Sequence, residues 1–84
     1  MNEIQLNELV TRAERLINQT VSYEINVQGK MILVEGVFSQ IGNTQGIGEI
    51  GETRSYQIEG IIITPSGKPI QRPLLEIVQR IESK

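Results

Sequence analysis

The apolar residues of this chain change their spacing twice, from a helical period to a strand period and back. In the first segment they recur at i, i+3, i+4 and i+7, the spacing that gathers side chains into one stripe along an α-helix. This stripe consists of Leu6, Leu9, Val10, Ala13, Leu16 and Ile17. Because Asn2 and Gln5 have the spacing of a capping box, the sequence predicts an amphipathic helix over residues 3–19.

The C-terminal segment returns to the helical spacing. Its apolar stripe consists of Leu74, Ile77, Val78 and Ile81. Pro73, which directly precedes the stripe, suits the first position of a helix, where its missing N–H has no intrahelical partner to lose. We therefore predict a second helix over residues 73–83.

Between the two helical segments, apolar and polar residues alternate with a period of two on either side of Gly29. Such alternation is typical of strands with one buried face, and glycine supplies the positive φ of a tight turn. The sequence predicts a hairpin of strands 21–28 and 31–41. A two-residue loop at Gln28-Gly29 or at Gly29-Lys30 pairs odd residues of the first strand with even residues of the second. The predicted core face carries Val21, Tyr23, Ile25, Val27, Ile32, Val34, Gly36 and Phe38.

A third strand follows a glycine-rich stretch. Residues 42–51 contain four glycines and are interpreted as a flexible connection. Alternation resumes over residues 53–64, and Pro65-Ser66-Gly67-Lys68 predicts a turn before the second helix. The predicted architecture is α+β, a single domain over residues 1–84 with the element order α-β-β-β-α. In it, a three-stranded antiparallel sheet carries two helices packed mainly on one face.

The register between the second and third strands stays open by a residue or two. A symmetrical pairing sets Phe38 opposite Tyr56, which is a favourable aromatic pair. The same pairing sets Glu35 opposite Glu59, and like charges directly opposed in a sheet are unfavourable. The order of the strands in the sheet also stays open.

The second face of the predicted sheet is more apolar than a face in water should be. If both helices cover the face of Val34 and Phe38, five apolar side chains remain on the other side. These are Met31, Leu33, Val37, Ile61 and Ile63. Covering one aliphatic side chain is worth about 1.5–3 kcal/mol, so we expect this patch to bind a partner, in a homodimer or in a complex with another protein. The alternative is that one helix crosses to this face and buries it.

The composition removes most of the side chains that carry out catalysis or hold metals, because the chain has no histidine, cysteine, aspartate or tryptophan. Zinc sites need imidazole or thiolate ligands, and a serine nucleophile needs a positioned base. Glu24, Glu35 and Glu59 can share one sheet face, which is typical of a solubilising surface rather than of an acid–base pair or a cation site. We predict no enzyme activity, no cofactor and no metal site.

Residues 46–51 spell G-x-G-x-x-G, the pattern of dinucleotide-binding loops. That motif works where its glycines open a helix inside a parallel βαβ unit. Here a strand follows the glycines and no crossover helix exists. The pattern is therefore interpreted as a hairpin loop.

Nucleic-acid binding is the first alternative function. The element order resembles that of double-stranded-RNA-binding domains, but those domains open their second helix with a lysine cluster, and this chain has Ile70-Gln71-Arg72-Pro73 there. Arg72, Arg80 and Lys84 could form only a thin basic edge. The net charge of −2 neither attracts nor repels nucleic acid strongly. We consider nucleic acid an unlikely partner.

The sequence thus predicts a small accessory or regulatory protein that acts by protein–protein binding through the apolar face. A nucleic-acid-binding regulator is the second interpretation, and a small-molecule-binding protein or enzyme is the third. Apolar runs such as Ile61 to Ile63 are far shorter than the roughly 20 residues that a membrane span needs. Without cysteine the chain cannot form the disulfides that small secreted domains use, so we predict a cytoplasmic protein with no membrane contact.

Overall fold

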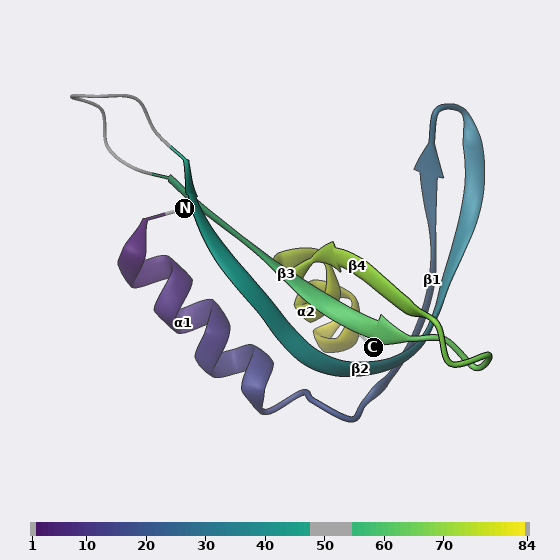
Figure 1. Cartoon of the computed structure of the whole chain (residues 1–84), viewed down its shortest axis with the longest axis horizontal. Coiled ribbons are helices and arrows are strands. Elements are labelled where there is room, and N and C mark those ends of the chain that lie inside the picture. Colours follow the sequence, from purple (N-terminus) through teal and green to yellow (C-terminus); the bar gives the residue numbers. More distant parts are fainter. Residues whose placement is uncertain (1, 48–54, 84) are drawn as a thin grey trace.

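The computed structural model describes residues 2–47 and 55–83 and contains two helices and an antiparallel sheet (Figure 1). In chain order the elements are α1 (Glu3–Glu14), β1 (Thr20–Val27), β2 (Lys30–Ile47), β3 (Ser55–Ile63), β4 (Pro69–Pro73) and α2 (Leu74–Glu82). The strand order is β1-β2-β3-β4, so every strand pairs with its neighbour in sequence. The predicted α+β architecture is confirmed. The prediction of three strands is wrong, because β4 makes the sheet four-stranded.

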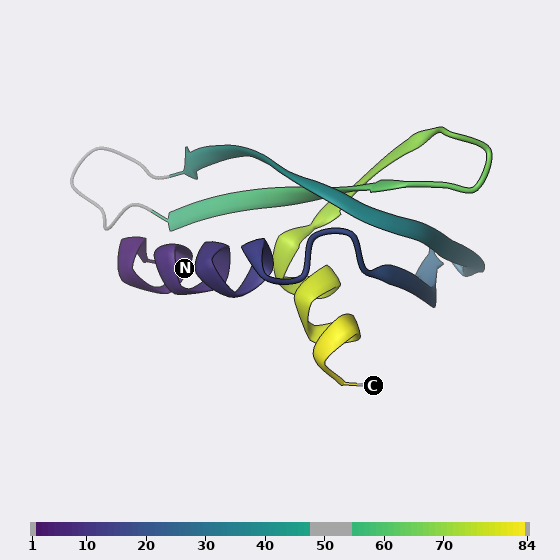
Figure 2. The same cartoon turned by 90° about the horizontal axis from the view of Figure 1, so that it is seen from below.

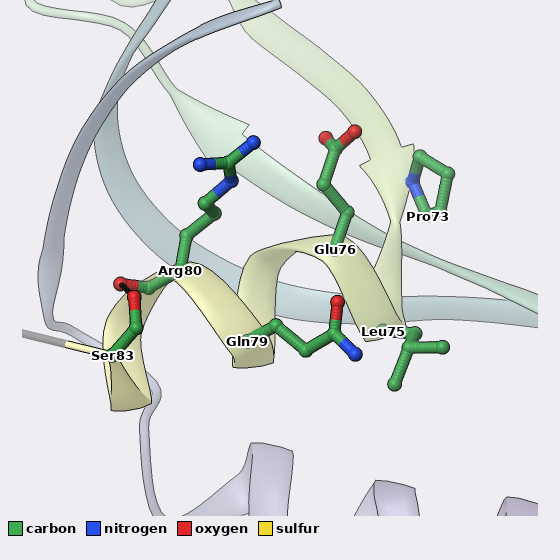
Figure 3. A pocket seen from close by; sticks show the side chains of 6 residues that line it. All are labelled: Pro73, Leu75, Glu76, Gln79, Arg80 and Ser83. Carbon is green, nitrogen blue, oxygen red and sulfur yellow. Dashed lines mark hydrogen bonds between the residues drawn. The ribbon is translucent and has the colours of Figure 1, made fainter.

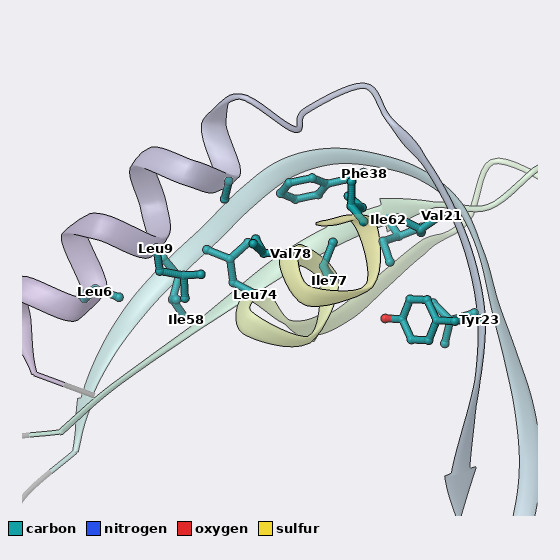
Figure 4. Packing of buried hydrophobic residues seen from close by; sticks show 13 residues of the cluster. Leu6, Leu9, Val21, Tyr23, Phe38, Ile58, Ile62, Leu74, Ile77 and Val78 are labelled. Carbon is teal, nitrogen blue, oxygen red and sulfur yellow. The ribbon is translucent and has the colours of Figure 1, made fainter. Parts of the chain in front are cut away.

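Both helices lie on one side of the sheet, as Figure 2 shows. They pack against the face that carries Val34 and Phe38, and together they form the core seen in Figure 4. Its buried side chains are Leu6, Leu9, Ala13, Val21, Tyr23, Val34, Phe38, Ile58, Ile62, Leu74, Ile77, Val78 and Ile81. An exposed ion pair between Arg12 of α1 and Glu82 of α2 joins the two helices outside this core.

The β1–β2 hairpin has the predicted pairing. Gln28 and Gly29 form its two-residue loop with φ values of 52° and 81°, as a type I′ turn requires. The loop is closed by the Gly29 N–H, which donates to Asn26 Oδ1 at 3.0 Å. Two predicted core residues are not buried, however. Val27 is 39% exposed and Ile32 is 45% exposed, because the end of the hairpin extends beyond the helices (Figure 1).

The register of β2 with β3 lies outside the predicted range. Phe38 pairs with Ile62 instead of Tyr56, a difference of six residues (62 − 56 = 6). Two irregularities, between Phe38 and Gln40 and between Ile41 and Thr44, shift the pairing along β2, and bulges of this kind cannot be read from alternation alone. The pairing extends β2 to Ile47, so residues 42–47 are strand rather than flexible connection. The rest of the predicted loop, residues 48–51, lies outside the described residues.

Helix α1 begins as predicted and ends early. The capping box is present, since the Gln5 N–H donates to Asn2 Oδ1 and the Asn2 N–H donates to Gln5 Oε1. The helix stops at Glu14 rather than near residue 19. The cause is tertiary: the Asn18 N–H donates to the Phe38 carbonyl, and the Phe38 N–H donates to the Gln19 carbonyl.

The fourth strand occupies residues that the sequence assigned to the approach of the second helix. Pro69 and Pro73 bound β4, which lies at the edge of the sheet, where proline is tolerated because its missing N–H faces away from the ladder. Ile70 pairs with Ile62 of β3. Pro73 has an extended backbone with ψ of 132° and caps α2, which begins one residue later than predicted.

Alanine substitutions at two glycines can measure how closely the backbone of β2 approaches the end of β3. Gly36 lies at this approach, and Gly67 lies away from it. Gly36 has a φ of +153°, and a Cβ there would lie 2.2 Å from the Ile63 carbonyl oxygen. Gly67 in the turn before β4 has a φ of +87°, with nothing near a Cβ within 4 Å. We expect Gly67→Ala to lower the free energy of unfolding by about 1–2 kcal/mol, the cost of the backbone conformation alone. We expect Gly36→Ala to cost clearly more, because the two strands must also separate. Urea unfolding of both variants measures the difference, and equal losses would refute the close approach.

Candidate functional site

The face of the sheet opposite the helices, called the outer face below, is formed by residues that alternate with the core residues along each strand. Its members follow from the pairing of the four strands and are Thr20, Ser22, Glu24, Asn26, Met31, Leu33, Glu35, Val37, Gln40, Glu59, Ile61, Ile63, Pro69, Gln71 and Pro73. In the described part of the chain, no helix lies over these residues (Figure 2). The outer face therefore contains all five residues predicted to bind a partner.

Three of the five predicted residues lie together. Val37 pairs directly with Ile63, and Ile61 lies two residues away on β3. Val37 is 38% exposed, whereas Ile61 and Ile63 are half-buried by their neighbours in the sheet. Pro69 of β4 pairs with Ile63 and extends this apolar surface to the sheet edge. Val37, Ile61 and Ile63 are called the central patch below.

The other two predicted residues lie apart from the central patch. Strand β3 ends at Ile63 opposite Val37, so the part of β2 before Val37 pairs only with β1. Met31 and Leu33 lie on this two-stranded extension, called the arm below, and are 60% and 54% exposed. Glu35 separates them from Val37 along β2. The single predicted patch is thus two apolar surfaces with a carboxylate between them.

The charges of the outer face all have one sign. Glu24, Glu35 and Glu59 lie on the outer face and are exposed, as predicted for glutamates that form a solubilising surface. No lysine or arginine of the described residues is among its members. The field over the apolar surfaces is therefore negative. Within residues 2–47 and 55–83, no three of the potential metal ligands form a cluster.

A polar cluster on the helix side was not predicted from the sequence. The Tyr23 hydroxyl donates to Glu76 Oε2 at 2.7 Å, and Arg72 donates to both carboxylate oxygens of Glu76 at 2.8 Å each. The Arg80 guanidinium lies over the Tyr23 ring, 5.2 Å from its centroid. Glu76 and Arg80 lie four residues apart on α2, the spacing at which helical side chains can pair. The carboxylate instead binds Arg72, which has the same four-residue spacing but belongs to β4.

The cluster joins β1, β4 and α2 and has little capacity for chemistry. Hydrogen bonds from Arg72 hold the pKa of Glu76 below its usual value, so this carboxylate is a weak base. Burial, with the hydrogen bond to Glu76, raises the pKa of the Tyr23 hydroxyl and keeps it protonated. An open hollow beside the cluster is lined by Leu75, Gln79 and Ser83 as well as Glu76 and Arg80 (Figure 3). No described group in this hollow is both nucleophilic and activated.

The predicted basic edge is only partly available. Arg72 forms an ion pair with Glu76, and the Arg80 guanidinium lies over the Tyr23 ring. Lys84 lies outside the described residues. Nucleic-acid binding therefore stays a prediction of second rank.

No protein-family model matches the chain, and comparisons with curated proteins and with solved structures found no significant match. Neither described helix is long and apolar enough to span a membrane. Any statement about function therefore depends on the surfaces of this chain itself.

The polar cluster makes the stability of the fold depend on pH. Because the pKa of Glu76 is lowered in the folded state, its contribution is present above the usual glutamate value of 4.5 and is lost as the pH falls below it. We expect Glu76→Gln to lower the free energy of unfolding by about 1–3 kcal/mol at neutral pH, since Tyr23 and Arg72 lose a charged acceptor. The variant should also show a weaker loss of stability on acidification, measured by urea unfolding between neutral pH and pH 3.

Glu82→Gln is the matched control, because it removes the same charge from α2 at an exposed ion pair with Arg12. Exposed pairs contribute about 0–1 kcal/mol. If both variants lost equal stability and kept the acid dependence of the parent chain, the cluster would have no special role in holding α2 on the sheet.

Proposed function

We propose that this chain is a small non-catalytic accessory or regulatory protein of the cytoplasm that binds a larger protein on its outer face. The observation that carries the proposal is the placement of both helices on the opposite side, which leaves the central patch and the apolar residues of the arm uncovered (Figure 2). The lack of an activated group in the hollow on α2 supports binding rather than catalysis.

The uncovered side chains supply a drive to associate. Fully burying one aliphatic side chain stabilises a protein by about 1.5–3 kcal/mol. A side chain that is already partly buried can gain only the share of this free energy that corresponds to its exposed fraction. The exposed fractions of Met31, Leu33 and Val37 lie between 38% and 60%. The run from Gly60 to Thr64 is also β-branched and uncharged, a composition that promotes aggregation where it stays uncovered. A partner that covers both surfaces would remove this hazard.

The negative charge of the outer face favours a partner whose surface carries positive charge. If two copies met face to face, each would bring Glu24, Glu35 and Glu59 into one interface, and no described lysine or arginine of this face could neutralise them. Desolvating unpaired carboxylates costs several kcal/mol each. A protein surface with aliphatic side chains flanked by lysine or arginine satisfies both the apolar surfaces and the glutamates. The same carboxylates oppose the phosphates of nucleic acid.

The test begins with a photo-reactive amino acid in place of Ile63, in extracts of the source cells, and with the same amino acid in place of Gln79, which is exposed on α2. A protein recovered from position 63 and not from position 79 is then purified, and its affinity for the unmodified chain is measured by calorimetry. Measured affinity for the purified protein, rather than capture alone, supports the proposal.

Variants then locate the binding surface. We expect Leu33→Glu and Val37→Glu to leave the monomer folded and to weaken binding at least about tenfold, because the new carboxylate is desolvated only in the complex. Glu35→Lys should weaken binding as well and reduce its dependence on salt, because Glu24 and Glu59 remain. Gln79→Glu adds the same charge on the helix side and should leave the affinity unchanged. If the outer-face variants bound as well as Gln79→Glu, the outer face would not be the binding surface.

A further inference from the structure

The two edges of the sheet are not equivalent. Strand β4 has five residues and is bounded by Pro69 and Pro73, neither of which has an N–H to donate. Strand β1 has eight residues and no proline. Because prolines and short length are the features that keep an edge from pairing with another strand, β4 is a closed edge and β1 is an open one.

The open edge presents a regular row of backbone groups. Val27 and Lys30 flank the two-residue turn and exchange hydrogen bonds, so from Val27 backwards every second residue of β1 faces β2. The N–H and C=O groups of Ser22, Glu24 and Asn26 point away from β2. The described residues provide no backbone hydrogen bond to these three positions. No bulge interrupts the row, since the pairing of β1 with β2 has no register shift.

Pairing with a further strand would stabilise the arm. It extends beyond both helices (Figure 1), and its helix-side residues Val27 and Ile32 are exposed although they continue the apolar pattern of the core. A two-stranded hairpin without further packing is marginally stable in water. A third strand alongside β1 would add a ladder of hydrogen bonds and cover Val27.

We propose that β1 pairs antiparallel with β1 of a second copy, around a two-fold axis at Ile25. An axis at Glu24 would set the two Glu24 carboxylates against each other, which is unfavourable. An axis at Ile25 sets Glu24 opposite Asn26 of the second copy and sets Tyr23 opposite Val27. Each exposed Val27 then packs beside a Tyr23 ring, and an axis nearer the start of β1 would leave Val27 uncovered.

This pairing joins four strands from each copy into one continuous sheet. Residues opposed in an antiparallel ladder point to the same side, so the two outer faces lie on one side of the dimer and all helices lie on the other. The dimer forms through the edge and leaves both central patches free. It is therefore independent of the proposed binding of a larger protein, and each can fail without the other.

The absence of cysteine from the sequence makes a direct test possible. Ile25 would face its own copy at a position that does not exchange hydrogen bonds, where Cα atoms lie about 4.5 Å apart, within the range that a disulfide spans. We expect Ile25→Cys to form a disulfide-linked dimer rapidly under mild oxidation. Gln71→Cys, on the closed edge strand β4, is the matched control and should remain largely monomeric. Equal rates of cross-linking for the two variants would overturn the proposed axis.

The reversible dimer is tested by sedimentation without any cysteine. We expect Glu24→Pro to shift the protein to monomer, because it removes one outward N–H that makes no bond with residues 2–47 or 55–83. Glu24→Gln should remain a dimer. Asn26→Lys should lower the dissociation constant at least about threefold relative to Asn26→Glu, because each copy gains an attraction instead of a repulsion with Glu24 across the interface. Circular dichroism shows whether each variant is folded.

Outcomes for the edge and for the outer face can be told apart. Val37→Glu lies on the outer face away from β1's open side and should leave the dimer intact. A parent chain that sediments as a monomer at millimolar concentration would overturn the edge pairing, whatever the result of the partner-binding experiment. A dimer that is lost in Val37→Glu and kept in Glu24→Pro would also overturn it, in favour of association through the outer face.

Discussion

Helix α2 rests on the sheet at a point where β3 has no side chain. A Cβ on Gly60 would lie 2.6 Å from Ile77 Cδ1 and 3.0 Å from Phe38 Cε1, so a larger residue there would require the Ile77 side chain to move. Because β4 ends at Pro73 and α2 begins at Leu74, no connecting residues exist with which the helix could reach the other side of the sheet. The helix is therefore held on the inner face, and the bare outer face and the contact of Arg72 with Glu76 both follow from that position.

Features encoded by neighbouring residues could be predicted from the sequence. The capping box at Asn2 and the tight turn at Gly29, predicted as either Gln28-Gly29 or Gly29-Lys30, each depend on a few adjacent positions, and so does the pairing of β1 with β2. The period of the apolar residues also identified the two faces of the sheet, and hence placed the five predicted partner-binding residues on the outer face. Features that depend on contacts between distant segments could not be predicted in this way.

Three errors illustrate that limit. Only three residues separate Pro69 from Pro73, too few for alternation to distinguish a strand from the start of a helix. Helix α1 ends early because Asn18 bonds to Phe38, a residue twenty positions further along the chain (38 − 18 = 20). The division of the apolar patch follows from the end of β3 at Ile63, which depends on bulges in β2 that no local pattern indicates.

The prolines of β4 have a consequence for how large an assembly of this chain could grow. Sheets with two open edges can add copies without limit and form fibres, whereas a closed set of contacts gives an assembly of fixed size. With Pro69 and Pro73 bounding β4, that edge of the sheet cannot add another strand, whereas β1 can. Pairing of β1 with β1 would use up that edge in both copies at once, so the two prolines of a short strand oppose the addition of further copies at the two outer ends of the joined sheet.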